Sequence, residues 1–453
     1  MEIVSAVRIG VQNLSLIHFS VLRLQIPVTS PRQRHIPVMF LLSLCVSATA
    51  WVYVHRILEP WADAKEVQKD GLKAQMGDLY PRWVGTRELL LNGRNPYSTE
   101  VSHEIQMAYY GHIVIQEDVA QRPIDEQRFV YPVYVVFLMA PTIYLDFARV
   151  QFWAPFVLGG FAGLSVLFSV GLLDWRTRWT TTTALILFVL SSPQIVQGMR
   201  HQQLALVVAC LLTAAAWLVH KGHLATAGGV LAFSTIKPQM ALLPLIWFIL
   251  WAAGERCSRW RLLMGFGVTI TLLVGAGELL LPGWPADFLA AMAAYRKYFP
   301  TTSLPRLVLG DSLGITASFV IVIWSLVLGW KYRKIAGSSQ QFVWVFAGFS
   351  MGTVLAFPLF TPFNQALLIL PAILVVHQWA AFSRLSRLMF IAIMFWPWIA
   401  AMALLFLRPA LTPASNLPLL PAFAASAVPV LLPVLFFVRK RTVIAPVGES
   451  TID

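Results

Sequence analysis

The stretch QLALVVACLLTAAAWLVHKGHLATAGGVLAFSTIKPQMALLPLIWFILWAAG, residues 203–254, determines the fold class of this chain. It holds three apolar runs, 203–219, 224–236 and 239–254, and both of its lysines lie between runs. A membrane-spanning helix needs about 20 predominantly apolar residues. Backbone polar groups find no water partners in lipid, so runs of this kind form helices rather than strands.

Similar runs recur along most of the chain. The other runs are 36–58, 129–145, 151–173, 178–196, 262–282, 312–330, 341–359, 364–380, 385–406 and 417–438. The 453 residues are 58% hydrophobic and only 12% charged, which excludes an ordinary soluble globular protein. The sequence therefore predicts an all-α polytopic membrane protein.

Basic clusters at the ends of the runs indicate the topology. The clusters are Arg32/Arg34, Arg176/Arg178, Arg256/Arg259/Arg261, Lys331/Arg333/Lys334, Arg384/Arg387 and Arg439/Lys440/Arg441. Positive charge marks cytoplasmic loops, so both termini are expected inside. That requires an even number of crossings. Pro132 and Pro141 favour a broken or re-entrant 129–145, which leaves about twelve crossings in a domain of residues 36–441. Residues 1–35 form a basic cytoplasmic lead-in and 442–453 a cytoplasmic tail.

The formal net charge of +13 does not indicate a nucleic-acid partner, because no basic groove with interleaved aromatics is evident. The three cysteines, Cys45, Cys210 and Cys257, are far apart, so neither a disulfide framework nor a zinc site is predicted. No metal or other cofactor is demanded by the sequence.

The loop 59–128, between the first two runs, is expected on the outer face. It carries twelve of the 21 acidic residues: Glu59, Asp63, Glu66, Asp70, Asp78, Glu88, Glu100, Glu104, Glu117, Asp118, Asp125 and Glu126. Such a polar segment is expected to fold over the membrane surface, with short interfacial helices. We therefore expect the functional site here.

The segment Gly77-Asp78-Leu79-Tyr80-Pro81-Arg82-Trp83 starts one of these helices. Leu79, Trp83, Leu89 and Leu90 are predicted to lie in the membrane interface. An acid ahead of such a helix is placed to meet a lipid headgroup or a lipid-linked sugar. The alternative is that Asp78 only caps the helix.

Other polar segments are predicted on the same face. Arg200, His201 and Gln202 supply donors for a phosphate or for sugar hydroxyls, or they form a merely solvated loop. Lys237, beside the helix-breaking Pro238, either faces an anion or snorkels to the interface. Arg296, in a loop of aromatics and cations at 283–310, and the segment 360–365 suit an anionic headgroup or plain interfacial anchoring.

The order of these motifs resembles the integral-membrane glycosyltransferases of the GT-C fold, specifically glycosyltransferase family 87. The matching motifs are Asp78 with Tyr80, Asn95-Pro96-Tyr97, Tyr131-Pro132 and Lys237-Pro238-Gln239. The chain departs from the family pattern at Val133, where a second proline is usual, and at 200–203, where a Gly-Gln-Asn run is usual.

The resemblance implies a polyprenyl-phosphate sugar as donor, mannose in the first place, and a lipid or glycan acceptor among membrane lipids. Asp78 would be the general base of an inverting transfer. Lys237 would bind the donor phosphate, and the further substrate-binding candidates are Arg200, His201, Gln202, Arg296, Tyr80 and Arg82. The enzyme would lie in the cell membrane, the bacterial inner membrane in the first place, with its site on the outer or periplasmic face.

Two other functions stay open at this point. A lipid or solute transporter or flippase would show paired broken helices in two related halves, and no such symmetry is evident. A polysaccharide polymerase or ligase would carry its large outer loop late in the chain.

Overall fold

The computed structural model describes residues 36–53, 56, 76–114, 126–298, 302–359, 361–407, 428–429 and 432–433. The N-terminal lead-in 1–35, the tail 442–453, most of the run 417–438 and the parts 59–75 and 115–125 of the acidic loop lie outside the described residues. So do seven of the twelve acidic residues of that loop: Glu59, Asp63, Glu66, Asp70, Glu117, Asp118 and Asp125.

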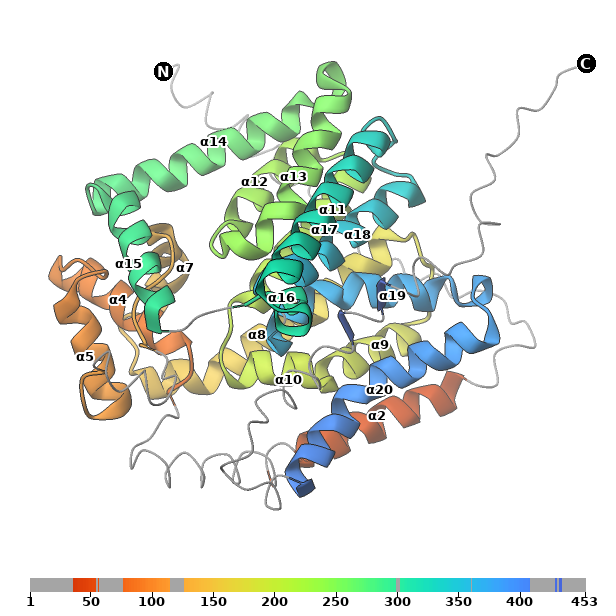
Figure 1. Ribbon diagram of the computed structural model, residues 1–453, viewed down its shortest axis with the longest axis horizontal. Helices are drawn as coiled ribbons and strands as arrows, with labels where there is room; N and C mark the ends of the chain where they lie inside the picture. The colour runs from red at the N-terminus through yellow and green to blue at the C-terminus, as the bar shows by residue number, and fades with distance from the viewer. Residues whose placement is uncertain are drawn as a thin grey trace, which may run out of the picture.

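All regular elements within these ranges are helical (Figure 1). The α-helices of the first half are α2 Ile36–Tyr53, α4 Leu79–Asn92, α5 Thr99–Tyr110, α7 Val136–Met139, α8 Phe147–Leu172, α9 Trp179–Ser191, α10 Pro193–Arg200 and α11 Ala205–His220. Those of the second half are α12 Leu224–Ser234, α13 Pro238–Gly254, α14 Arg256–Leu280, α15 Trp284–Tyr298, α16 Leu304–Leu309, α17 Asp311–Tyr332, α18 Gln340–Ala356, α19 Ile369–His377 and α20 Arg384–Leu407. Short 3₁₀ turns are η5 Val133–Val135, η6 Ala140–Thr142, η7 Pro362–Leu368 and η8 Trp379–Ala381.

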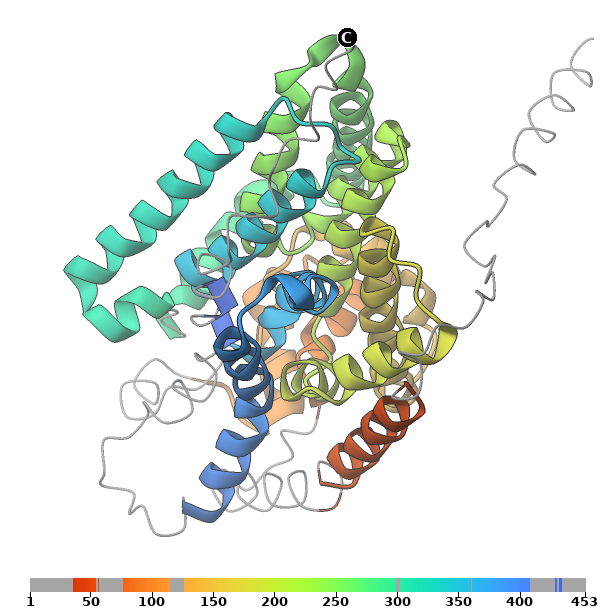
Figure 2. The ribbon, with the colours of Figure 1, turned by 90° about the vertical axis from the view of Figure 1, so that its right-hand side faces the viewer.

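Three of these helices, α8, α14 and α17, are each long and apolar enough to cross a membrane. A fourth span arises if α9 and α10, which meet at a bend of 63°, are counted as one broken span. Figure 2 shows α17 at the periphery, where little of it is covered by protein. The helices thus indicate a membrane protein, whereas the number of about twelve crossings remains a prediction.

The run 129–145 is broken. It forms η5, α7 and η6 in succession, and together these span only Val133–Thr142. A helix of that length covers about 15 Å, half the hydrocarbon thickness. Pro132 precedes the first turn and Pro141 lies in the last, where each lacks a backbone donor.

The core is built around α11, most of whose residues are buried. Its small and branched apolar side chains pack on α8 and α12, and α12 in turn packs along α14. A Cβ at Gly228 would lie 2.1 Å from the carbonyl oxygen of Leu262, so the backbones of α12 and α14 approach more closely than any larger residue allows.

The helices of the loop 59–128 form a separate group. α4 and α5 lie beside α7 and α15 at one side of the molecule (Figure 1). Leu79, Trp83 and Leu89 are each only 6% exposed, so their predicted place in the membrane interface is wrong. The apolar face of α4 is instead covered by protein, and the indole Nε1 of Trp83 donates to the carbonyl oxygen of Thr142 at 3.1 Å. Leu90 is half-buried.

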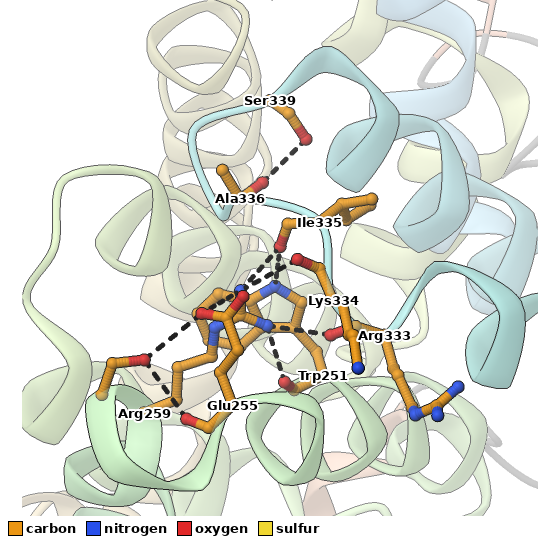
Figure 3. Close-up of polar contacts among 9 residues, drawn as sticks. Trp251, Glu255, Arg259, Arg333, Lys334, Ile335, Ala336 and Ser339 are labelled. Carbon is orange, nitrogen blue, oxygen red and sulfur yellow. Dashed lines mark hydrogen bonds and ion pairs between the residues drawn. The ribbon is translucent and has the colours of Figure 1, made fainter.

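One member of the basic clusters has a structural role that its charge pattern did not reveal. Arg259, 5% exposed, stacks on Trp251 at 4.0 Å and donates to the carbonyl oxygens of Trp251, Arg333 and Ile335 at 2.8–2.9 Å. Glu255 pairs with its guanidinium at 2.9 Å. Figure 3 shows these contacts joining the α13–α14 turn to the loop after α17. Arg259 is therefore a buried structural contact and not a solvated side chain.

Candidate functional site

Asp78 precedes α4, and its backbone is bonded to a distant segment. Its N–H donates to the carbonyl oxygen of His201 at 3.0 Å. The side chain makes no capping hydrogen bond to the first turn of α4, and the residue is half-buried. The capping role that was the alternative for Asp78 is therefore not what the structure shows.

The residues before Asp78 and after His201 fit each other closely. Gly77 has φ +63°, and Gln202 has φ +53°, a left-handed conformation that few non-glycine residues adopt. A Cβ at Gly77 would meet the side-chain amide of Gln202 at 3.0 Å. Gln202 is 3% exposed. Glycine at 77 thus permits both the backbone turn and the contact that places Asp78 beside the 200–203 segment.

Lys237 lies at the break between α12 and α13, where Pro238 starts the second helix. It is 6% exposed, so it does not snorkel to an interface. Its Nζ donates to the Oδ1 of Asn364 at 2.8 Å and to the Oε1 of Gln203 at 3.2 Å, and it lies 5.1 Å from the ring of Phe363. Both oxygens belong to neutral amides.

The start of α4, the segment 200–203 and the break at Lys237 lie close enough for their charges to interact. Arg82 is four residues after Asp78, so both lie on one face of the α4 start, and its guanidinium sits 4.5 Å over the ring of Tyr131. The charges of Asp78 and Arg82 both act on Lys237, and the charge of Asp78 also acts on His201. We call the set Asp78, Arg82, His201, Gln202, Gln203, Lys237 and Asn364 the Asp78–Lys237 cluster.

Three predicted site residues are placed differently. Tyr80 packs edge-on against Phe147 at 4.8 Å, and burial raises the pKa of its phenol. Arg200 is half-buried and acts electrostatically on His201. Arg296 is exposed on α15, and no contact within the described residues joins it to the cluster.

The Asn95-Pro96-Tyr97 motif and the residues around Tyr131 make hydrogen bonds around the cluster. The phenol of Tyr97 donates to the carbonyl oxygen of Tyr131 at 2.6 Å, and the amide of Asn95 donates to Asp287 on α15 at 2.7 Å. The phenol of Tyr134 lies 2.9 Å from the hydroxyl of Thr235, two residues before Lys237. Hydrogen bonds thereby connect the Asn95-Pro96-Tyr97 motif to Tyr131, and connect Tyr134 to the residues just before Lys237.

An apolar cavity is lined in part by η7, the segment that also contains Asn364 of the cluster. Its walls come from α9, α19 and α20 and include Leu185, Phe188, Ile373, Phe390 and Met394. Its polar lining consists of Ser192, Gln194 and Gln365, and Gln365 directly follows the Asn364 that holds Lys237. The cavity and the cluster therefore share the segment η7, which lines the cavity with Gln365 and holds Lys237 with Asn364.

No protein family, no curated protein and no solved structure matches this chain. Within the described ranges, no three His, Cys, Asp or Glu side chains converge as ligands for a metal ion.

Sequence reasoning missed Gln203 and Asn364 as partners of Lys237. The available signal was the pair Asn364-Gln365 at the start of the apolar run 364–380, since buried amides seldom go without a partner. Tyr131 had been noted as part of a motif, but not as the support of Arg82.

Proposed function

We propose that this chain is a membrane glycosyltransferase. It moves a hexose or pentose, with mannose the first candidate, from a polyprenyl-phosphate donor to a lipid or glycan acceptor. The observation that carries the proposal is the convergence of Asp78, whose side chain makes no capping bond, with Lys237, a buried ammonium bound only by neutral oxygens.

The reaction needs a base and a cation. Asp78 takes the proton from an acceptor hydroxyl, whose oxygen attacks the anomeric carbon of the donor sugar. The bond from that carbon to the phosphate oxygen breaks with inversion, and the polyprenyl phosphate leaves with the bonding pair. A positioned carboxylate contributes on the order of 10²–10⁴-fold to such a transfer, and a fixed cation stabilises the charge on the departing phosphate.

Lys237 suits the phosphate for two reasons. A buried charge is costly unless it is compensated, and the two amide oxygens solvate the ammonium without neutralising it. An ammonium has three N–H donors, and two of them are used by Asn364 and Gln203. The third can donate to a phosphate oxygen, for which lysine is a compact point charge.

A lipid-linked donor also needs a place for its hydrocarbon. Gln365 lines the apolar cavity between α9, α19 and α20, and its neighbour in the chain, Asn364, is a hydrogen-bond partner of Lys237. A phosphate at Lys237 and a prenyl chain in this cavity form one continuous amphiphile. The proposal extends to a GT-C-type bundle of about twelve crossings, with α4 and the cluster on the outer face of the membrane.

The test is mass spectrometry of the lipids and glycans of a strain that lacks this chain. We expect one lipid or glycan to lose the mass of a single sugar, with restoration by the wild type and not by Asp78→Asn. A transporter would instead leave every covalent structure unchanged and alter only the distribution of a solute or lipid across the membrane. Unchanged masses would therefore refute the proposal.

A further inference from the structure

Asn364 reaches the cluster from a segment with an unusual conformation. It lies in η7, a 3₁₀-helix of seven residues, whereas such helices rarely exceed three or four residues. The residue is 4% exposed. Specific contacts must hold this segment, because its own backbone bonding is poor.

The orientation of the Asn364 amide is set by Lys237. Its Oδ1 accepts from the Nζ of Lys237 at 2.8 Å, and its Nδ2 donates to the hydroxyl of Thr361 at 2.6 Å. A flipped amide would direct two N–H donors at an ammonium, which accepts no hydrogen bond. Thr361, Asn364, Lys237 and Gln203 therefore form one chain of hydrogen bonds.

We propose that Asn364 is a positioning residue, which holds the Lys237 ammonium in place and leaves its charge free for an anionic phosphate group. The proposal rests on the function proposed above. A neutral amide is essential to it: a carboxylate at 364 would hold Lys237 equally well, but would cancel the charge that attracts the ligand.

This distinction makes Asn364→Asp the decisive variant. It preserves the shape of the side chain and strengthens the contact to Lys237, so a purely structural role predicts that it is tolerated. The positioning role predicts that binding of farnesyl phosphate weakens by about 10-fold or more, because the new carboxylate neutralises the charge of Lys237 and repels the phosphate. Gln203→Glu should act in the same direction, and provides a second variant if the first does not fold.

The experiment measures the Kd of farnesyl phosphate and the thermal midpoint of the full-length protein in lipid nanodiscs. Gln378→Glu is the matched control, because it makes the same amide-to-acid change at another buried residue, one bonded to Gln340 and separated from Asn364 by the whole length of α19. We expect Asn364→Asp and Gln203→Glu to bind weakly with near-wild-type midpoints, while Gln378→Glu binds normally.

The experiment distinguishes failure of the positioning role of Asn364 from failure of the phosphate site at Lys237. If Lys237→Met loses binding but folded Asn364→Asp and Gln203→Glu bind like the wild type, the positioning role is refuted and the phosphate site stands. If the wild type and Lys237→Met bind farnesyl phosphate equally, the proposed phosphate site is refuted and the role of Asn364 falls with it.

Discussion

The backbone N–H of Asp78 donates to the carbonyl oxygen of His201 at 3.0 Å. This bond joins the start of α4, in the loop after the first apolar run, to the turn between α10 and α11. A backbone bond fixes the position of Asp78 without using its carboxylate. The loop is thereby anchored to the core at the residue proposed to act as the base.

Gly77→Ala tests this anchor, with Gly93→Ala as its matched control. Both glycines are left-handed, at φ +63° and +64°, so both variants should lose about 1–2 kcal/mol of unfolding free energy from backbone strain. Only Gly77 faces the amide of Gln202, while a Cβ at Gly93 meets open space. We expect Gly77→Ala alone to slow sugar transfer, by about 10- to 100-fold, because Asp78 is displaced. Equal transfer rates in the two variants would show that the anchor does not position the base.

Lys237→Met tests the phosphate site in the transfer reaction. Loss of the ammonium should raise the donor KM by about 10-fold or more. The free energy of unfolding should fall by at most about 1–3 kcal/mol, because Asn364 and Gln203 lose a donor while a costly buried charge is removed. The measurement is steady-state kinetics with varied donor at a saturating acceptor concentration. A normal donor KM in the folded variant would exclude Lys237 from donor binding.

Arg259→Ala should destabilise the protein by about 1–3 kcal/mol, because it leaves several carbonyl oxygens without their donor. Arg261→Ala, two residues later on an exposed position, should have an effect within about 0.5 kcal/mol. The two thermal midpoints in detergent give the comparison. A small shift in Arg259→Ala would mean that the contact between the α13–α14 turn and the loop after α17 contributes little.

The sidedness of the membrane is testable with the chain's own cysteine. Cys257 is exposed beside the basic cluster expected inside. In a variant that keeps Cys257 but carries Cys45→Ser and Cys210→Ser, a membrane-impermeant maleimide should label the protein only after the inner face is opened. Asn92→Cys, at an exposed position of α4 in a background without the native cysteines, should be labelled from outside in intact cells. The reverse pattern would overturn the proposed topology.

The helical membrane architecture could be predicted because long apolar runs are a local signal. The breaks at Pro132 and Pro141 were equally readable, since proline acts on its own helix. A glycine after the last apolar residues of a helix is a similar local signal, and Gly93 ends α4 in a left-handed conformation.

Packing between segments that are far apart in the sequence could not be predicted from such local signals. Leu79 and Trp83 show an apolar face, but whether lipid or protein covers that face depends on where α7 and α8 lie. Arg259 looks in sequence like any other member of a basic loop. Asn364 becomes the partner of Lys237 only because η7 returns to the break between α12 and α13.

Asp78→Asn tests the central claim most directly. The variant nearly preserves the shape of the side chain and removes its basicity, so donor binding and thermal midpoint should stay near wild type while the transfer rate falls on the order of 10²–10⁴-fold. Glu104→Gln is the control, because Glu104 lies in the same loop but pairs with Arg94 at a half-exposed position. The measurement is single-turnover transfer from polyprenyl-phosphate mannose by purified protein in lipid nanodiscs. A large loss in Asp78→Asn with none in Glu104→Gln is the expected result, whereas wild-type turnover in Asp78→Asn, or equal losses in both, would contradict the assignment of Asp78 as the base.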